Sequence, residues 1–214
     1  MAGSIQDDQL VDQYKIKNLI GHDQFRHHYS AYEIDTGKAV SLSLLRPEYV
    51  NDDPFVQDYL QRTQSLTQIR HPNLTAYLQV GLIDGSAPYV TMDPVSGFPL
   101  GERVERLAQG QEPVHPVYAL SLVQQTASGL ALLERLDLYH HELTPNSIQL
   151  KSVTLKGEDS VIVTDLDIPD CCAGDFVEYN EYAAAYLSPE QLSGDAVDGR
   201  SHVYTLGVIL HELL

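Results

Sequence analysis

The sequence has few cysteines, no long apolar run and few basic residues, and each shortage excludes a class of protein. The only cysteines, Cys171 and Cys172, are neighbours. Adjacent cysteines rarely form a disulfide, so no disulfide framework is expected and a reducing compartment is favoured. No stretch approaches the run of about eighteen apolar residues that a membrane-spanning helix needs. We therefore expect a cytoplasmic chain whose residues make no membrane contact.

The shortage of basic residues restricts the partners of the protein. Thirteen lysines and arginines stand against 30 aspartates and glutamates, which gives a net charge of −17. Nucleic acids and anionic lipid surfaces are bound by cationic faces that release counterions, so neither is an expected partner. We expect another protein as the partner.

The order of local patterns predicts an α+β chain in two lobes. Short alternating runs broken by turns predict strands at 14–20, 28–34, 39–45, 74–83 and 88–93, with a helix at 54–69. Apolar residues at helical spacing predict a long helix at 116–137 and another from 202 onward, and a strand pair is expected at 147–150 and 160–165. Residues 166–185 look like a loop. We assign residues 1–12 to a tail, 13–94 to an N-lobe and 95–214 to a mainly helical C-lobe.

Seven motifs in order along residues 12–214 resemble those of serine/threonine protein kinases of the bacterial type. The resemblance implies a bilobal kinase-like fold, with an antiparallel N-lobe sheet, one regulatory helix and a C-lobe that is expected to be truncated. It also allows the chain to be the cytoplasmic part of a longer membrane-anchored protein. The motifs are LIGHDQFRHHYSAYE (glycine-rich loop), AVSLSLLRPE (third strand), LTQIRHPNL (end of the regulatory helix), PYVTMDPVSG (hinge), YHHELTPNSIQL (catalytic loop), VTDLD (Asp-Phe-Gly segment) and AYLSPEQL (Ala-Pro-Glu segment).

In the N-lobe, the resemblance implies a nucleotide site whose charged groups have changed. The family's phosphate-binding lysine falls on Ser43, and its glutamate partner on the regulatory helix falls on Arg62. The first glycine of the loop is kept as Gly21, but the second and third fall on Asp23 and Arg26. Backbone amides approach phosphate closely where no Cβ intervenes, so these replacements weaken phosphate binding.

Several N-lobe residues admit two interpretations. Arg62 either supplies the lost cation or is a solvated residue of the helix surface. Arg26 either lies in the phosphate space as an internal mimic of the ligand or, as we favour, is a flexible exposed loop residue. At the hinge, Asp93 and Val95 can offer backbone groups to an adenine beside the gatekeeper Met92, unless side chains fill that cavity. The histidines of the loop are more simply surface residues than a metal site or pH switch; they are His22, His27 and His28, the last at the family's valine position.

In the C-lobe, the resemblance places Glu142 at the catalytic base, one methylene longer than the family's aspartate. Thr144 replaces the lysine that steadies the γ-phosphate, and Ser147 replaces the asparagine that holds the second magnesium ion. His141 replaces the arginine that clamps a phosphorylated activation loop.

Asp165 matches the magnesium-binding aspartate, and Asp167 replaces a glycine. The two carboxylates either hold a divalent cation or are turn residues.

Two further expectations concern the C-terminal part. The acidic stretch from Asp165 to Glu190, which carries Tyr179, Tyr182 and Tyr186, either docks a basic partner or, as we favour, is a solvated loop whose tyrosines pack on the lobe. Glu190 is expected to be unpaired, since the family's arginine partner would lie beyond Leu214.

Together these departures predict a pseudokinase, a regulatory or scaffolding module that acts on another kinase or signalling component. No cofactor would be required, and ATP with Mg²⁺ would bind weakly. Two alternatives stay open: an atypical protein serine/threonine kinase that uses Glu142 and Asp165, and a nucleotide-binding module without phosphotransfer.

Overall fold

The computed structural model describes residues 8–51, 53–111, 113–152, 159–168 and 181–214, and it divides into two compact units. The first comprises Met1–Arg70 and Ala76–Val95, and the second His71–Thr75 and Ser96–Leu214. The break after Val95 is one residue from the boundary assigned from sequence. The sequence did not predict that residues 71–75 would belong to the second unit. It occurs because Thr75 and Asn73 exchange backbone hydrogen bonds with Val163, both of 2.9 Å.

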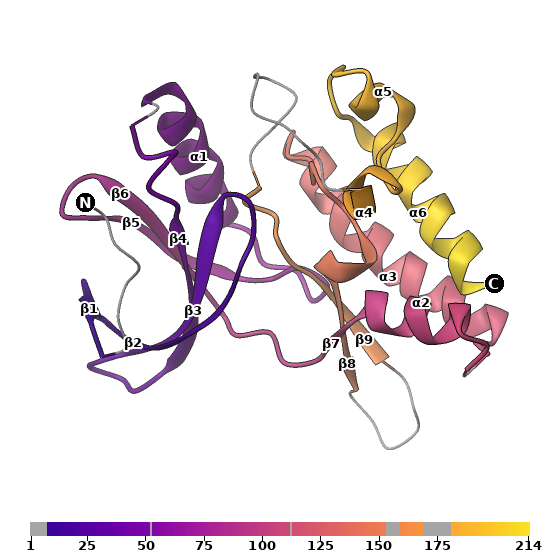
Figure 1. Ribbon diagram of the computed structural model, residues 1–214, viewed down its shortest axis with the longest axis horizontal. Coiled ribbons are helices and arrows are strands. Elements are labelled where there is room, and N and C mark those ends of the chain that lie inside the picture. The colour runs from indigo at the N-terminus through magenta and orange to yellow at the C-terminus, as the bar shows by residue number, and fades with distance from the viewer. Residues whose placement is uncertain (1–7, 52, 112, 153–158, 169–180) are drawn as a thin grey trace. The chain divides into compact units, whose positions relative to one another are not determined.

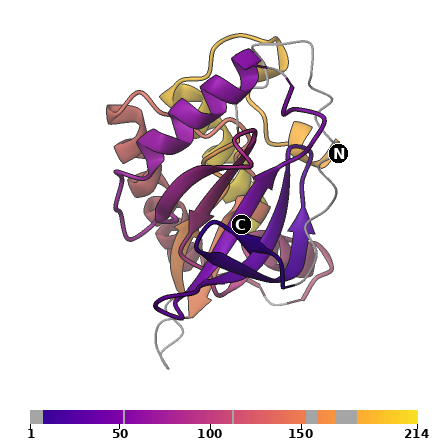
Figure 2. The ribbon, with the colours of Figure 1, turned by 90° about the vertical axis from the view of Figure 1, so that its left-hand side faces the viewer.

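The first unit is a six-stranded antiparallel sheet with one helix (Figures 1 and 2). The sequence predicted the helix and five of these strands, all but β1. Its strand order is β1-β2-β3-β4-β6-β5, and helix α1 contacts β5 and β6. The strands are β1 (Leu10–Val11), β2 (Tyr14–His22), β3 (Arg26–Glu33), β4 (Ala39–Leu45), β5 (Tyr77–Ile83) and β6 (Ala87–Met92).

Alternating side chains of these strands form the core of the first unit. Tyr14, Ile16, Tyr29, Leu42 and Tyr89 are among the residues buried there. The strands could be predicted from the sequence because one face of each strand is buried, so apolar and polar residues alternate along it.

The predicted tail at residues 1–12 is too long. Val11 is buried, and β1 pairs with β2 through Leu10–Lys15 and Val11–Tyr14. Asp12 has a φ of 49°, the left-handed backbone that closes this tight hairpin. A two-residue strand carries too little alternation to be seen in the sequence.

Helix α1 spans Asp53–Leu66 and ends three residues before the predicted end of the helix at residue 69. The chain tightens after Leu66, because Thr67, Gln68 and Ile69 each donate a backbone hydrogen bond to the residue three positions earlier. The Thr67 hydroxyl also donates to the Gln64 carbonyl at 2.7 Å. Threonine competes in this way for helix carbonyls and ends the regular helix.

The second unit is mainly helical and contains a three-stranded sheet of order β7-β8-β9. Helix α3 contacts both α6 and β9, and α2 contacts η1 and β8. Among the described residues, no helix is both long and apolar enough to cross a membrane. The elements are β7 (Phe98–Pro99), α2 (Leu100–Ala108), α3 (Pro116–Arg135), η1 (Pro145–Ser147), β8 (Ile148–Ser152), β9 (Asp159–Val163), α4 (Glu181–Ala184), α5 (Pro189–Leu192) and α6 (Gly199–Leu213).

Helix α3 ends two residues before the predicted position 137. Asp137 takes a φ of 56°, and Leu138 donates its N–H to the Leu133 carbonyl at 3.0 Å. This left-handed residue with a six-to-one hydrogen bond is a helix-terminating motif. It turns the chain sharply into the segment that contains the predicted catalytic residues.

Three helices of the second unit were missed, namely α2, α4 and the four-residue α5. Helix α2 follows directly on Pro99 and contains Gly101, so the sequence looked like a turn region there. Helix α4 lies inside the predicted loop at 166–185, of which residues 169–180 are outside the described part of the chain.

Candidate functional site

One group of candidate residues lies in the first unit, on β3 and β4, where His28 and Ser43 are cross-strand partners. Their side chains share one face of the sheet, and His28 Nδ1 lies 2.7 Å from Ser43 Oγ. Ser43 has 1% of its surface exposed. The hydroxyl at the predicted lysine position is therefore held inside the first unit by a histidine.

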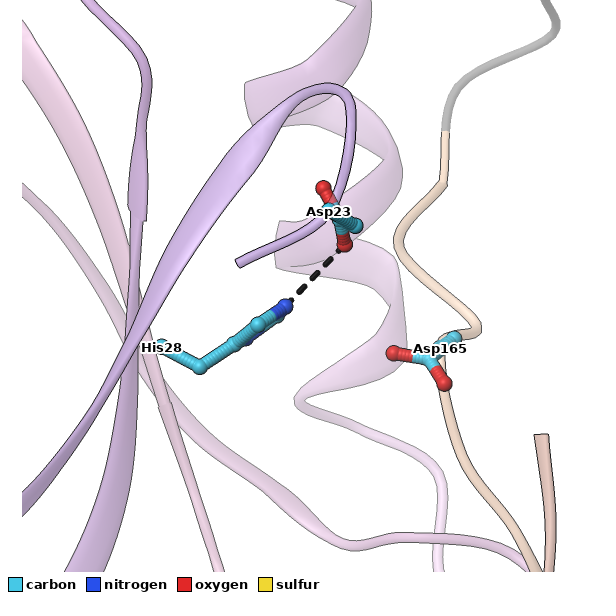
Figure 3. Close-up of side chains that lie close together, drawn as sticks. All are labelled: Asp23, His28 and Asp165. Carbon is cyan, nitrogen blue, oxygen red and sulfur yellow. Dashed lines mark hydrogen bonds and ion pairs between the residues drawn. The ribbon is translucent and has the colours of Figure 1, made fainter. Parts of the chain in front are cut away.

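Asp23 extends this contact into a network, as Figure 3 shows for its hydrogen bond to His28. Its Oδ2 lies 3.0 Å from His28 Nε2 and accepts from Arg26 Nε at 2.8 Å and from Arg26 Nη2. The carboxylate can only accept, so His28 Nε2 carries a proton. The result is a continuous chain from Arg26 through Asp23 and His28 to Ser43.

The interpretation of Arg26 as a flexible, exposed loop residue is wrong. Its side chain is 1% exposed, because the ion pair with Asp23 compensates the loss of water around the guanidinium. The sequence offered one signal, an aspartate three positions earlier. Whether an aspartate and an arginine at this spacing form an ion pair depends on the conformation of the turn between them.

The network also changes the ionisation of Asp23. Burial alone would raise its pKa, but the charge of Arg26 and the hydrogen bonds from His28 and Arg26 outweigh that effect. Together they hold the pKa of Asp23 well below its usual range. The carboxylate stays negative throughout the physiological pH range.

The other predicted N-lobe positions are distributed over the same unit. Gly21 lies on β2 opposite His28, and a Cβ there would meet no atom within 4 Å. Arg62 is half-buried on α1.

At the predicted hinge, the Asp93 N–H donates to the Ala76 carbonyl at 2.9 Å, and its carboxylate pairs with Lys38 at 2.8 Å. The Asp93 N–H is therefore already engaged, and the expectation that Asp93 offers backbone groups to a ligand stays a prediction. Val95 is half-buried at the end of the first unit.

A second group of candidate residues lies in the second unit, in the segment between α3 and β8. Ser147 Oγ accepts from the Thr144 N–H at 3.1 Å and donates to the Thr144 carbonyl at 2.9 Å. Both residues are buried. The serine hydroxyl thus closes its own loop. Glu142 lies two residues before this closure and is half-buried.

Two residues that sequence reasoning did not single out hold this segment in place. His202 on α6 accepts from the His140 N–H through Nε2 at 3.0 Å. Gln191 on α5 donates to the His141 carbonyl at 2.8 Å. A further bond joins His140 Nε2 to the Thr164 carbonyl at 2.9 Å. Three separate elements therefore fix the backbone around His140.

Asp165 follows β9 with a φ of 60°, and the Thr164 hydroxyl donates to its Oδ2 at 2.8 Å. Asp167 is fully buried. Magnesium prefers several oxygen ligands in near-octahedral geometry. Asp165 suits that role, but the Ser147 hydroxyl is engaged within its own loop. The donor set of the second unit does not fit the second magnesium ion of the family.

Glu190, predicted to lack the family's arginine partner, instead accepts a hydrogen bond from the Ser201 hydroxyl at 2.6 Å. That hydrogen bond lowers the pKa of Glu190. Of the predicted acidic loop, Asp170, Asp175, Glu178 and Tyr179 lie outside the described residues. Tyr186 is buried and donates to Glu212 at 2.9 Å, and its ring lies 5.2 Å from that of Tyr182. At least this part of the stretch is packed.

Comparison with known proteins agrees with the geometry of both units. The family model described as "Protein tyrosine and serine/threonine kinase" matches residues 14–214. The serine/threonine-protein kinase PrkC of Bacillus subtilis is 29% identical over 209 residues, which cover 96% of this chain and 31% of PrkC. The serine/threonine-protein kinase PknB of Mycobacterium leprae is 28% identical over 213 residues, covering 96% and 33%. The chain thus spans about a third of the length of these relatives.

Solved structures show the same fold. The crystal structure of the Mycobacterium tuberculosis PknI kinase domain superposes with a TM-score of 0.76 over 98% of this chain and 77% of that one, at 20% identity. The predicted antiparallel N-lobe and mainly helical C-lobe are confirmed as the protein kinase fold.

Proposed function

The chain belongs to the protein tyrosine and serine/threonine kinase family, and we propose that in this member the fold serves binding and regulation rather than phosphoryl transfer. The observation that carries the proposal is the state of Ser43. This hydroxyl stands where the family resemblance expects a phosphate-binding cation, and it is buried against His28. A neutral group in that position contributes no charge to phosphate binding.

The segment between α3 and β8, which contains Glu142, Thr144 and Ser147, supports the same proposal. Ser147 uses its hydroxyl to close the turn at Thr144, which leaves the second-metal position without its family ligand. Glu142 keeps a carboxylate at the base position but is longer than the family's aspartate. A displacement of about 1 Å in a reacting group can cost on the order of 100-fold in rate.

We infer that the protein requires neither ATP nor Mg²⁺ to act and that its partner is another protein, a kinase or a signalling component. A net charge of −17 favours a basic docking surface on that partner. The adjacent cysteines of the sequence, which rarely form a disulfide, favour a cytoplasmic location.

Two measurements test this proposal. The first is thermal unfolding with and without millimolar ATP and Mg²⁺. Ligand at about 100 times its dissociation constant would stabilise the fold by about 2.7 kcal/mol, and we expect no such shift. A shift without phosphotransfer would instead support the nucleotide-binding alternative.

The second measurement is phosphate transfer from labelled ATP to a generic protein substrate and to the chain itself. We expect no transfer above that of a Glu142→Ala, Asp165→Ala double variant, with the PrkC kinase domain as the parallel reference. Transfer by the unmodified chain that disappears in the double variant would establish the atypical kinase and end the proposal.

A further inference from the structure

The turn that joins β2 and β3, residues Asp23–Phe25, is closed around a single carboxylate. Asp23 Oδ1 accepts the N–H groups of Phe25 at 2.8 Å and Arg26 at 2.7 Å. Oδ2 accepts from the Arg26 guanidinium and from His28. Converging backbone N–H groups beside a guanidinium form the kind of concavity that binds phosphate oxygens. Here a side chain of the same turn occupies it.

The turn is also fixed from outside. Arg46 Nη1 donates to the Asp23 carbonyl at 3.3 Å and to the Gln24 carbonyl at 3.2 Å. The Arg46 N–H donates to the Phe25 carbonyl at 2.8 Å.

Aromatic packing adds a second constraint on the turn. Phe25 is 2% exposed, with its ring 5.3 Å from that of Tyr49 and 6.1 Å from that of Phe55. The two N–H groups of the turn therefore cannot be redirected without breaking the contacts of Arg46 and this packing.

We propose that the Asp23 carboxylate is a built-in occupant of a phosphate-sized anion site on the β2–β3 turn, and that it excludes phosphate groups from this turn. A phosphate that approached Phe25 N–H and Arg26 N–H would have to displace the carboxylate from both donors. It would also meet a like charge that Arg26 and His28 keep ionised. This inference deepens the proposed function, since it concerns the loop that the family resemblance assigns to nucleotide phosphates, but its geometry lies wholly within the first unit.

The proposal predicts that removal of the carboxylate creates a phosphate site. In Asp23→Gly, two N–H groups and the Arg26 guanidinium lose an acceptor, and inorganic pyrophosphate can supply one. Hydrogen bonds to charged groups are each worth about tenfold or more in binding. We therefore expect Asp23→Gly to bind pyrophosphate at least about tenfold more tightly than the unmodified chain.

The experiment is a pyrophosphate titration of the ¹⁵N-labelled full chain without Mg²⁺. It follows the N–H signals of Phe25 and Arg26 and the Arg26 side-chain Nε–H. These signals should saturate in Asp23→Gly and stay fixed in the unmodified chain. Glu33→Gln is the matched control, because Glu33 also accepts side-chain hydrogen bonds in this unit, from Gln13 and Thr36. It should behave as the unmodified chain does. Asp23→Gly combined with Arg26→Gln should lose most of the gain.

Two results would overturn the proposal. One is a response of the unmodified turn to pyrophosphate equal to that of Asp23→Gly, and the other is a folded Asp23→Gly variant that binds no better than the unmodified chain. If the glycine variant does not fold, Asp23→Ala replaces it. That variant also removes the acceptor of the two N–H groups and of the Arg26 guanidinium, and absence of any gain in it would equally overturn the proposal.

The two proposals fail separately. Phosphate transfer by the unmodified chain would refute the assignment as a non-catalytic member and leave the pyrophosphate contrast intact. If Asp23→Gly and the unmodified chain bind pyrophosphate equally, the proposed role of the Asp23 carboxylate is refuted, whatever phosphate transfer is measured.

Discussion

Asp23, His28 and Ser43 each replace a residue that the family resemblance expects, respectively a glycine, a valine and a lysine. Considered one at a time, they are three separate losses. The structure shows them as parts of one hydrogen-bonded chain that also buries Arg26. Residues that share a network are not energetically independent, so the effects of their substitutions should be strongly non-additive.

The depressed pKa of Asp23 makes a prediction about acid stability. A carboxylate whose pKa is lowered by folding contributes stability above its unfolded pKa of about 4, and that contribution is lost as the pH falls below this value. Asp23→Asn should therefore lower the unfolding free energy by about 2 kcal/mol at pH 7 and by less at pH 3. Urea unfolding at both pH values measures the difference. If the variant and the unmodified chain differ in unfolding free energy by the same amount at pH 7 and pH 3, the charge of Asp23 does not stabilise the fold.

Gly97 lies where the backbone leaves room for no side chain. Its φ is 154°, and a Cβ would lie 2.4 Å from the Leu150 carbonyl oxygen of β8. Gly97→Ala should cost about 3 kcal/mol, because both backbone strain and the collision must be relieved.

Gly110 is the matched control for Gly97, with a φ of 73° and no atom within 4 Å of the added Cβ. Gly110→Ala should cost only about 1 kcal/mol, from backbone strain alone. Chemical denaturation of the two variants tests this, and equal losses would contradict the role of the Leu150 contact.

At the scale of elements, the long amphipathic helix α3 and the strands of the first sheet were predicted well, because their periodicity extends over many residues. Helix α2 was missed although Leu100, Val104 and Leu107 recur at helical spacing. The neighbouring Pro99 and Gly101 obscured this short pattern. Gly101 is there for packing, since a Cβ would lie 2.0 Å from the Asn146 amide oxygen.

Helix α6 supports the segment between α3 and β8 through the hydrogen bond from the buried His140 N–H to the buried His202 ring. His202→Ala leaves that N–H without this acceptor and should cost about 1 to 3 kcal/mol. Val203→Ala on the same helix is the control; Val203 is 70% exposed, so its loss should stay within about 0.5 kcal/mol. Thermal unfolding of both variants gives the comparison, and a neutral His202→Ala would show that α6 does not stabilise the segment.

At the scale of the whole molecule, the dominant property is the excess of negative charge. A net charge of −17 destabilises the compact state by self-repulsion, and salt screens that repulsion. The screening length falls from about 30 Å at 0.01 M to about 10 Å at 0.1 M ionic strength. We expect sodium chloride over this range to stabilise the protein by about 1 kcal/mol, or about 2 to 4 °C in Tm. A Tm that is constant or falls with salt would mean that local ion pairs outweigh the overall repulsion.

The sequence alone indicated the family and the order of the longer strands and helices in each unit, and it predicted the positions at which the family's catalytic residues have been replaced. Motifs and periodicity involve residues that are close together in the sequence, so they can be recognised without the structure. Only the tertiary structure decided what the replacements do. Arg26 is buried rather than exposed, and Ser43 faces His28, because strand register and turn closure bring together residues that are 15 or more positions apart or turn them inward. The free energy of a buried polar group depends on such partners, and the identity of a partner is not encoded in spacing along the chain.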